Sequence, residues 1–128
     1  RTDLKSKLTT NSTTIGNYYN NLWNITNTNV KYSTNYGIDF TVCPKRKTEN
    51  ANILLTTGAD ASFSLMNIYD IAGNVCEWTL EEASSNVDPC ILRGGDYHND
   101  GSGYPAGSRD GHSTSFSSYL VGFRLSLY

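Results

Sequence analysis

The sequence predicts an α+β fold with few helices, a small antiparallel sheet and much irregular structure. Asn, Ser and Thr make up about a third of the 128 residues, and these side chains favour turns and strands over long helices. One segment, residues 14–24, has apolar residues at helical spacing, and the chain ends on alternating apolar and polar residues. A chain of this length has enough residues for one domain around one modest core.

The composition excludes several classes of function. The net charge of -2 leaves no basic surface for nucleic acid and no polybasic patch for a membrane surface. No apolar run approaches the roughly 18 residues that cross a bilayer. We therefore expect no nucleic-acid partner and no membrane insertion.

The first half is predicted to contain one helix and then a long loop. The helix over residues 14–24 is expected to end at the Asn- and Thr-rich residues 24–29. Residues 31–60 are polar and show little periodicity. Their bulky side chains are expected to hold this loop against the core: Tyr32, Tyr36, Ile38, Phe40, Ile53, Leu54 and Leu55.

The second half is predicted to be richer in strands. Short buried strands interrupted by a turn at Gly73 are expected around Ile68, Tyr69, Ile71, Val75 and Trp78. Residues 91–93 indicate another strand. Phe123, Leu125 and Leu127 alternate with polar residues, which predicts a last strand with one buried face. The Gly-, Ser-, Asp- and Tyr-rich segment before it is expected to be a folded, displayed loop.

Three motifs in the second half resemble one known family. They are Asn67-Ile-Tyr-Asp-Ile-Ala-Gly-Asn-Val-Cys-Glu-Trp-Thr79, Leu92-Arg-Gly-Gly-Asp-Tyr97 and Gly122-Phe-Arg124. Their order and spacing are similar to the C-terminal half of the formylglycine-generating enzyme, or sulfatase-modifying factor, family, a branch of the C-type-lectin fold. The resemblance covers residues 65–128 well and residues 1–64 poorly, and it implies a single domain over residues 1–128.

The resemblance implies the fold without the catalytic group. Enzymes of this family oxidise sulfatase cysteines with their own cysteines, which follow the Arg-Gly-Gly segment. The three cysteines here, Cys43, Cys76 and Cys90, all precede that segment. We therefore predict that the protein is not an enzyme and that Cys76 is a small buried apolar residue.

Two carboxylates in the first motif could bind a cation. Asp70 and Glu77 are separated by a glycine turn, and calcium prefers six to eight oxygen ligands. The resemblance implies a structural calcium site made by these two side chains and the backbone oxygens of Gly73 and Val75. The alternative is that Glu77 anchors an internal hydrogen-bond network that braces the fold.

Three arginines occupy family-like positions, Arg93, Arg109 and Arg124. Each could contact an anion or a glycan. We favour the alternative, in which each makes bidentate hydrogen bonds that hold long loops in place.

The loop between the last two motifs is the predicted ligand-binding surface. Tyr offers rigid amphipathic contact area, and Asn, Ser and Gly provide adaptable hydrogen bonding, as in antibody loops. Its contact residues are expected to cluster, largely exposed, on one surface: Tyr97, His98, Asn99, Asp100, Ser102, Tyr104, Asp110, His112, Phe116 and Tyr119.

These features predict a non-catalytic, receptor- or adhesin-type binding domain on a phage particle or bacterial surface. Its expected partner is a host-surface protein or a glycan, with other virion proteins as further candidates. After residue 93 the chain lacks Lys, Glu, Gln, Met and Trp, which fits the variable proteins of diversity-generating retroelements, so residues 96–119 could be hypervariable. The alternatives are a virion structural or decoration domain without a specific ligand, and a divergent formylglycine-generating oxidoreductase.

Overall fold

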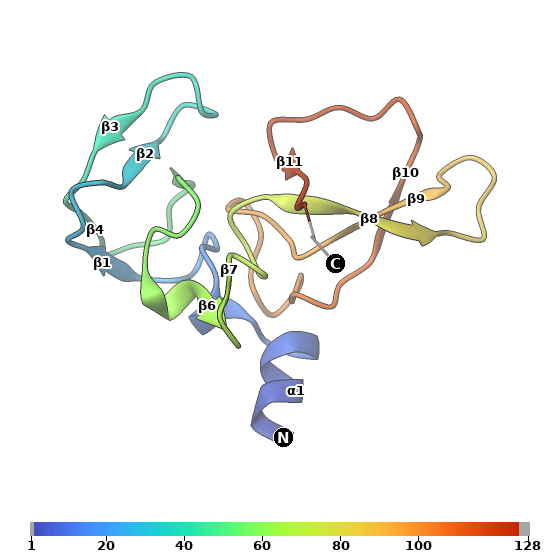
Figure 1. Cartoon of the computed structure of the whole chain (residues 1–128), viewed down its shortest axis with the longest axis horizontal. Coiled ribbons are helices and arrows are strands. Elements are labelled where there is room, and N and C mark those ends of the chain that lie inside the picture. The colour runs from blue at the N-terminus through green and yellow to red at the C-terminus, as the bar shows by residue number, and fades with distance from the viewer. Residues whose placement is uncertain (1, 126–128) are drawn as a thin grey trace.

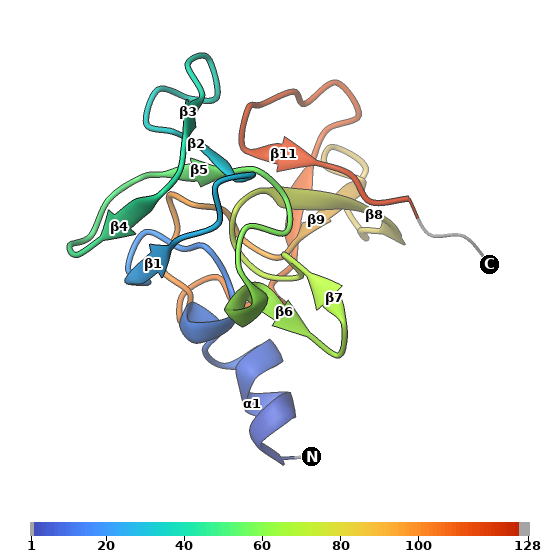
Figure 2. The ribbon, with the colours of Figure 1, turned by 60° about the vertical axis from the view of Figure 1, so that its left-hand side comes forward.

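The computed structural model describes residues 2–125 and, within them, contains one α-helix and four small sheets (Figure 1; Figure 2). The helix α1 (Thr2–Thr9) protrudes from one end of the molecule in both views. Most of the remaining chain is turns and irregular segments. The predicted α+β class, with few helices and little regular structure, is confirmed. No helix among the described residues is long and apolar enough to cross a membrane.

The helix expected over residues 14–24 is wrong. The chain forms a 3₁₀ turn at Thr13–Ile15, and strand β1 (Trp23–Ile25) follows after irregular backbone. Gly16 is extended, with φ −148° and ψ 162°, and has no room for a side chain because an added Cβ would lie 2.2 Å from the Ala72 carbonyl oxygen. Tertiary contacts therefore override the apolar spacing in this segment.

The first half forms strands where a loop was expected. Strand β1 pairs with β4 (Lys45–Lys47), and β2 (Lys31–Ser33) pairs with both β3 (Thr41–Val42) and β5 (Leu54–Leu55), all antiparallel. These strands enclose an apolar core of buried side chains: Trp23, Ile25, Val30, Cys43, Ile53, Leu55, Ala59 and Phe63. Of the residues expected to hold this segment to the core, Ile53 and Leu55 are buried, whereas Tyr36, Ile38 and Phe40 are exposed.

The second half contains the largest sheet, in the order β10-β9-β8-β11. The hairpin of β8 (Cys76–Glu82) and β9 (Cys90–Arg93) is antiparallel, β10 (Asp110–His112) pairs with β9, and β11 (Val121–Gly122) runs parallel to β8. Strand β9 confirms the strand predicted at residues 91–93. The hairpin of β6 (Ser64–Leu65) and β7 (Ile68–Tyr69) forms a separate sheet, and both residues of β7 are exposed rather than buried.

The final strand is shorter than predicted. Strand β11 ends at Gly122, and Phe123 and Leu125 are 74% and 81% exposed, so the expected buried face is absent from the described residues. Leu127 lies outside the described residues. The Arg124 guanidinium donates to the carbonyl oxygens of Tyr69 and Asp70 at 2.9 and 3.2 Å, which anchors this segment by a side chain instead of a ladder of backbone bonds.

Two buried asparagines join the halves. Asn17 donates to the Ile53 carbonyl oxygen at 2.7 Å and to Asn74 Oδ1 at 3.0 Å. Asn74 in turn exchanges two hydrogen bonds with the backbone of Leu55, at 2.9 and 3.0 Å. Gly73, with φ +67°, allows this close approach, because a Cβ there would lie 2.7 Å from the Asn17 carbonyl oxygen.

Candidate functional site

The predicted binding loop contributes to two separate aromatic clusters rather than one surface. His98 and Tyr119 gather around Tyr36, which comes from the loop between β2 and β3. His112 and Phe116 instead pack beside Trp78 of β8. The loop therefore lies across the molecule, with contact groups in two places.

The first cluster, Tyr36, His98 and Tyr119, forms an exposed surface that we call the aromatic patch. The ring centroids of Tyr36 and Tyr119 are 4.6 Å apart, and His98 lies 6.0 and 6.2 Å from them. Tyr36 is 51% exposed and Tyr119 is 52% exposed. The rings contact each other, so the patch is a continuous surface and not a cage around a central space.

Tyr97 was expected to be exposed, and this is wrong. It is 2% exposed, its ring meets His98 edge-on at 4.5 Å, and its hydroxyl has no hydrogen-bond partner within the described residues. Burial raises the pKa of Tyr97 to about 12. Its backbone nitrogen donates to the Asn74 carbonyl oxygen at 3.1 Å, which draws the start of the loop inward at the junction of the halves. Tyr97 therefore supports the patch and does not belong to its outer surface.

Three polar residues of the predicted set form a turn. The Asp100 carboxylate accepts hydrogen bonds from the backbone nitrogen and hydroxyl of Ser102, at 2.7 and 2.6 Å, and from Asn20 at 2.7 Å. Asn99 Oδ1 accepts from the backbone nitrogen of Asp96 at 2.9 Å. The bonds from Ser102 lower the pKa of the Asp100 carboxyl. These side chains hold the loop in shape, although Asp100 and Ser102 remain exposed.

The second cluster has a stacked pair at its centre. The rings of His112 and Phe116 lie 3.9 Å apart at 21°, and Phe116 meets Trp78 edge-on at 6.2 Å. His112 Nε2 lies 3.1 Å from Asp110 Oδ2. Of the ten predicted contact residues, Tyr104 is exposed but joins neither cluster.

Arg93 and Arg109 brace the loop through one carboxylate. Arg93 Nη2 donates to Glu81 Oε2 at 2.8 Å, with a second bond from Nε to Oε1, and Arg109 Nε donates to Glu81 Oε2 at 3.0 Å. Arg93 also donates to the carbonyl oxygen of Gly107. The hydrogen bond from Arg93 lowers the pKa of the Glu81 carboxyl. The predicted bidentate bracing role is confirmed for Arg93, whereas Arg109 makes one hydrogen bond to the same carboxylate. No motif singled out Glu81 as their partner.

Arg124 makes the third brace, on Glu77. Its Nε and Nη2 donate to the two carboxylate oxygens at 3.0 and 2.8 Å, in addition to the backbone bonds described above. Glu77 thus anchors the internal network that was the alternative to a cation site.

The residues of the expected calcium site lie close to this brace. Asp70, Val75 and Glu77 line one cavity of about 340 Å³, together with Arg124. Asp70 Oδ2 accepts a hydrogen bond from the backbone nitrogen of Gly58 at 2.7 Å, and burial raises the pKa of its carboxyl. Among residues 2–125, no three side chains of His, Cys, Asp or Glu come close enough to hold a metal ion.

These contacts do not fit a ready calcium shell. Both oxygens of Glu77 bind a guanidinium, and one oxygen of Asp70 binds a backbone amide. Calcium bound by Glu77 would have to displace the Arg124 guanidinium. Calcium binding at these residues stays a prediction.

Cys76 is half-buried and weakly hydrogen-bonded. Its Sγ lies 3.7 Å from Asp96 Oδ2, and burial together with this carboxylate raises the pKa of the thiol to about 12. The thiolate is the reactive form of cysteine, so the group stays protonated and unreactive at neutral pH.

Comparison with known proteins places these features in one family. No curated protein and no solved structure matches the chain. A family model, described as a sulfatase-modifying factor enzyme 1-like domain, matches residues 7–127. The match includes the first half, where the motifs found little resemblance. The chain therefore belongs to the sulfatase-modifying factor enzyme 1-like family.

Proposed function

We propose that this protein is a non-catalytic ligand-binding domain whose contact surface is the aromatic patch. The observation that carries the proposal is the exposure of Tyr36 and Tyr119, from segments far apart in the sequence, side by side on the surface. Large aromatic rings are the most frequent anchors of binding energy at interfaces, and an exposed cluster of them favours association.

The shape of the patch favours a broad partner. Its rings contact one another and leave no central space for a small molecule. The loop between β2 and β3 also exposes Ile38 and Phe40, and β3 exposes Val42, so the chain that follows Tyr36 adds further exposed apolar area. A host-surface protein or a glycan would present a surface of matching extent.

The cysteines support a role without catalysis. The positions after the Arg-Gly-Gly segment hold Asp96, Tyr97 and His98 in place of the cysteines used by the family's enzymes. Cys76 is held protonated by burial and by Asp96. Incubation with a sulfatase-type cysteine peptide, with and without copper, should give no formylglycine above a no-protein control.

We further propose that the domain acts on a virion or bacterial surface. The absence of five residue types after residue 93 supports a diversified loop, and His98 and Tyr119 lie in both that loop and the patch. A virion structural or decoration domain without a specific ligand is the competing role.

Binding of the labelled protein to a panel of bacterial cells and to a glycan array tests the proposal. Replacing either Tyr36 or Tyr119 by Ala should weaken binding by about tenfold or more, the effect of losing one interface anchor. Tyr69→Ala is the matched control, because Tyr69 is a 41% exposed tyrosine outside the patch. A loss of binding in Tyr69→Ala equal to the loss in the patch variants would contradict the assignment. No binding by the unmodified protein would favour the decoration role.

A further inference from the structure

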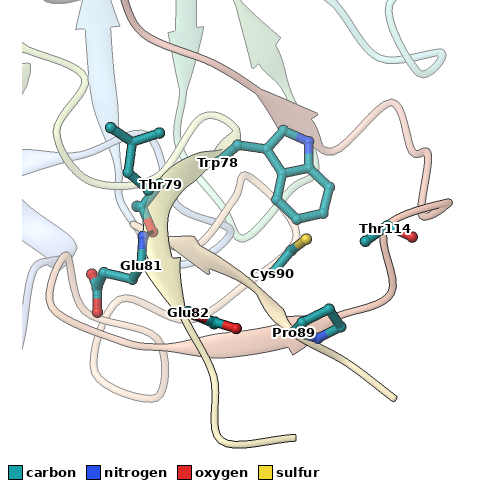
Figure 3. A pocket seen from close by; sticks show the side chains of 8 residues that line it. Trp78, Thr79, Glu81, Glu82, Pro89, Cys90 and Thr114 are labelled. Atoms are coloured by element: carbon teal, nitrogen blue, oxygen red, sulfur yellow. Dashed lines mark hydrogen bonds between the residues drawn. The ribbon is translucent and has the colours of Figure 1, made fainter. Parts of the chain in front are cut away.

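A second hollow surface lies on the hairpin of β8 and β9. A cavity of about 500 Å³ has an apolar wall made by Trp78, Leu80, Pro89 and Cys90, with Glu82 and Thr114 at its polar side. Figure 3 shows the Trp78 indole and the Cys90 thiol on the same side of the hairpin, with Pro89 and Thr114 beside them. We call it the Trp78 cavity, and it shares no residue with the aromatic patch.

A bulge in β8 shapes this cavity. The strands are in register at Trp78↔Leu92 and at Glu82↔Cys90, and the register shifts between these pairs. The Thr79 hydroxyl holds the bulge by donating to the Ile91 carbonyl oxygen at 3.1 Å. Leu80, within the bulge, is fully exposed to solvent. Bulges often redirect a side chain beside a functional site, and here the redirected side chain is apolar.

The two carboxylates that line the cavity differ in their hydrogen-bond partners. The Glu81 carboxylate is bound by two arginines, whereas the Glu82 carboxylate has no hydrogen bond or ion pair to any described residue. A free carboxylate therefore borders an apolar wall. The complementary occupant is an apolar group with a cation close to it.

The edge of β8 that faces away from β9 is open along residues 78–82, which line the cavity. Strand β11 pairs with β8 only at Cys76 and Glu77, so residues 78–82 have no partner strand on that side among the described residues. Figure 1 shows β11 beside only the first part of β8. An open strand edge offers unpaired backbone groups to an extended peptide, and adjacent pockets receive its side chains.

We propose that the Trp78 cavity and the open edge of β8 bind an extended peptide segment of a partner protein. The segment places an apolar side chain against Trp78 and Leu80 and a Lys or Arg against Glu82. This site is independent of the aromatic patch, so either one can fail while the other holds.

Three short peptides test the chemistry. The probe is acetyl-Lys-Leu-Val-Lys-amide, with acetyl-Glu-Leu-Val-Glu-amide as the control for charge and acetyl-Lys-Ser-Thr-Lys-amide as the control for apolar content. The chain has two tryptophans, so Trp23→Phe leaves Trp78 as the single fluorescent indole. The probe should change Trp78 fluorescence saturably and should slow alkylation of Cys90 in the unmodified protein, whereas the controls should do neither. Cys43, which is buried, is the internal reference for alkylation.

Variants on one hairpin complete the test. Leu80→Ser should weaken binding by about tenfold through the lost apolar contact, and Glu82→Gln by about two- to fivefold, the range of an exposed ion pair. Val87→Ser is the matched control, since Val87 is 76% exposed on the same hairpin but does not line the cavity. Equal response to the acidic peptide, or equal loss in Val87→Ser, overturns the proposal. A dimer in sedimentation that Leu80→Ser dissociates overturns it in favour of a second copy as occupant.

Discussion

The two halves of the molecule differ in the interactions that stabilise each of them. Residues up to 65 contain the main apolar core, with eight buried side chains between short strands. The half beyond residue 65 buries few large apolar side chains, and its long loop is held by Arg93 and Arg109 on Glu81 and by Arg124 on Glu77. The motifs that resemble the family lie in the second half, and they contain two of the braces, Arg93 and Arg124, but no residue of this main apolar core.

Because of this difference, substitutions in the two halves should lower stability by different amounts. Loss of core side chains removes apolar contacts that no other part of the chain replaces. Loss of a brace leaves a partly solvated charge and a loop that is still tethered at its ends. We therefore expect the first half to determine global stability and the second half to tolerate variation in its displayed residues.

The largest effect is expected for Phe63→Ala. Phe63 is fully buried in the first core, so the truncation should lower the free energy of unfolding by about 3–5 kcal/mol in urea denaturation. Phe123→Ala is the matched control, because Phe123 is 74% exposed and should change stability by less than about 0.5 kcal/mol. Similar losses in the two variants would show that burial of Phe63 in the first core does not determine stability.

A buried lysine makes the first half sensitive to pH. Lys47 is 3% exposed, donates to the Tyr18 carbonyl oxygen at 2.6 Å, and its pKa is lowered by burial to about 8 from an ordinary 10.5. Below pH 8 the lysine is protonated in both states and burial of its charge destabilises the fold. Between about pH 8 and 10.5 the folded state releases this proton while the unfolded state keeps it, so this contribution stabilises with rising pH.

Lys47→Met tests this contribution. The variant should be more stable than the unmodified protein at neutral pH, by up to about 3 kcal/mol less about 1 for the lost hydrogen bond. The difference should shrink between pH 8 and 10.5, as seen in urea denaturation at several pH values. Burial raises the pKa values of Cys43 and Cys76, which has the opposite effect on stability at alkaline pH, so the difference between the two proteins is the measured quantity. A constant difference across this range would contradict the assignment.

In the second half, Arg124→Met should cost about 1–2 kcal/mol, a modest value because Arg124 and Glu77 are 37% and 26% exposed. A double-mutant cycle with Glu77→Gln isolates the pair. The coupling should fall at high salt, because screening weakens partly exposed ion pairs. Additive losses in the two single variants would show that the ion pair itself contributes nothing, and that Arg124 acts through its bonds to the backbone of Tyr69 and Asp70.

The sequence predicted the class of fold and the braces, because both depend on local signals. Arg93, Arg109 and Arg124 stand in short motifs, and the strand at residues 91–93 begins with two apolar residues and ends before two glycines. The helix over residues 14–24 failed because Gly16 and Asn17 meet residues 72–74 and Ile53, partners that apolar spacing does not reveal.

The aromatic patch could be predicted only in part. His98 and Tyr119 were expected at the surface, whereas Tyr36 lies in a distant loop and was expected to hold that loop against the core. Tyr97 was placed outside because its neighbours are polar, whereas the turn at Gly94 and Gly95 directs it inward. Long-range packing therefore decides which of the loop's residues face solvent.

The smallest effect is expected for calcium. In the unmodified protein Arg124 binds both oxygens of Glu77, so millimolar calcium should raise the melting temperature only slightly. Arg124→Met frees this carboxylate beside Asp70, and the calcium-dependent rise in melting temperature should then become larger. The gain in free energy of unfolding should approach about 2–3 kcal/mol at a hundredfold excess over Kd if the oxygens of Gly73 and Val75 complete the shell. Adding Asp70→Asn to that variant should abolish the rise, and magnesium is the control for non-specific charge. A large rise in the unmodified protein that Arg124→Met leaves unchanged would show that calcium and the brace occupy different places, and the site of the cation would have to be sought elsewhere in the chain.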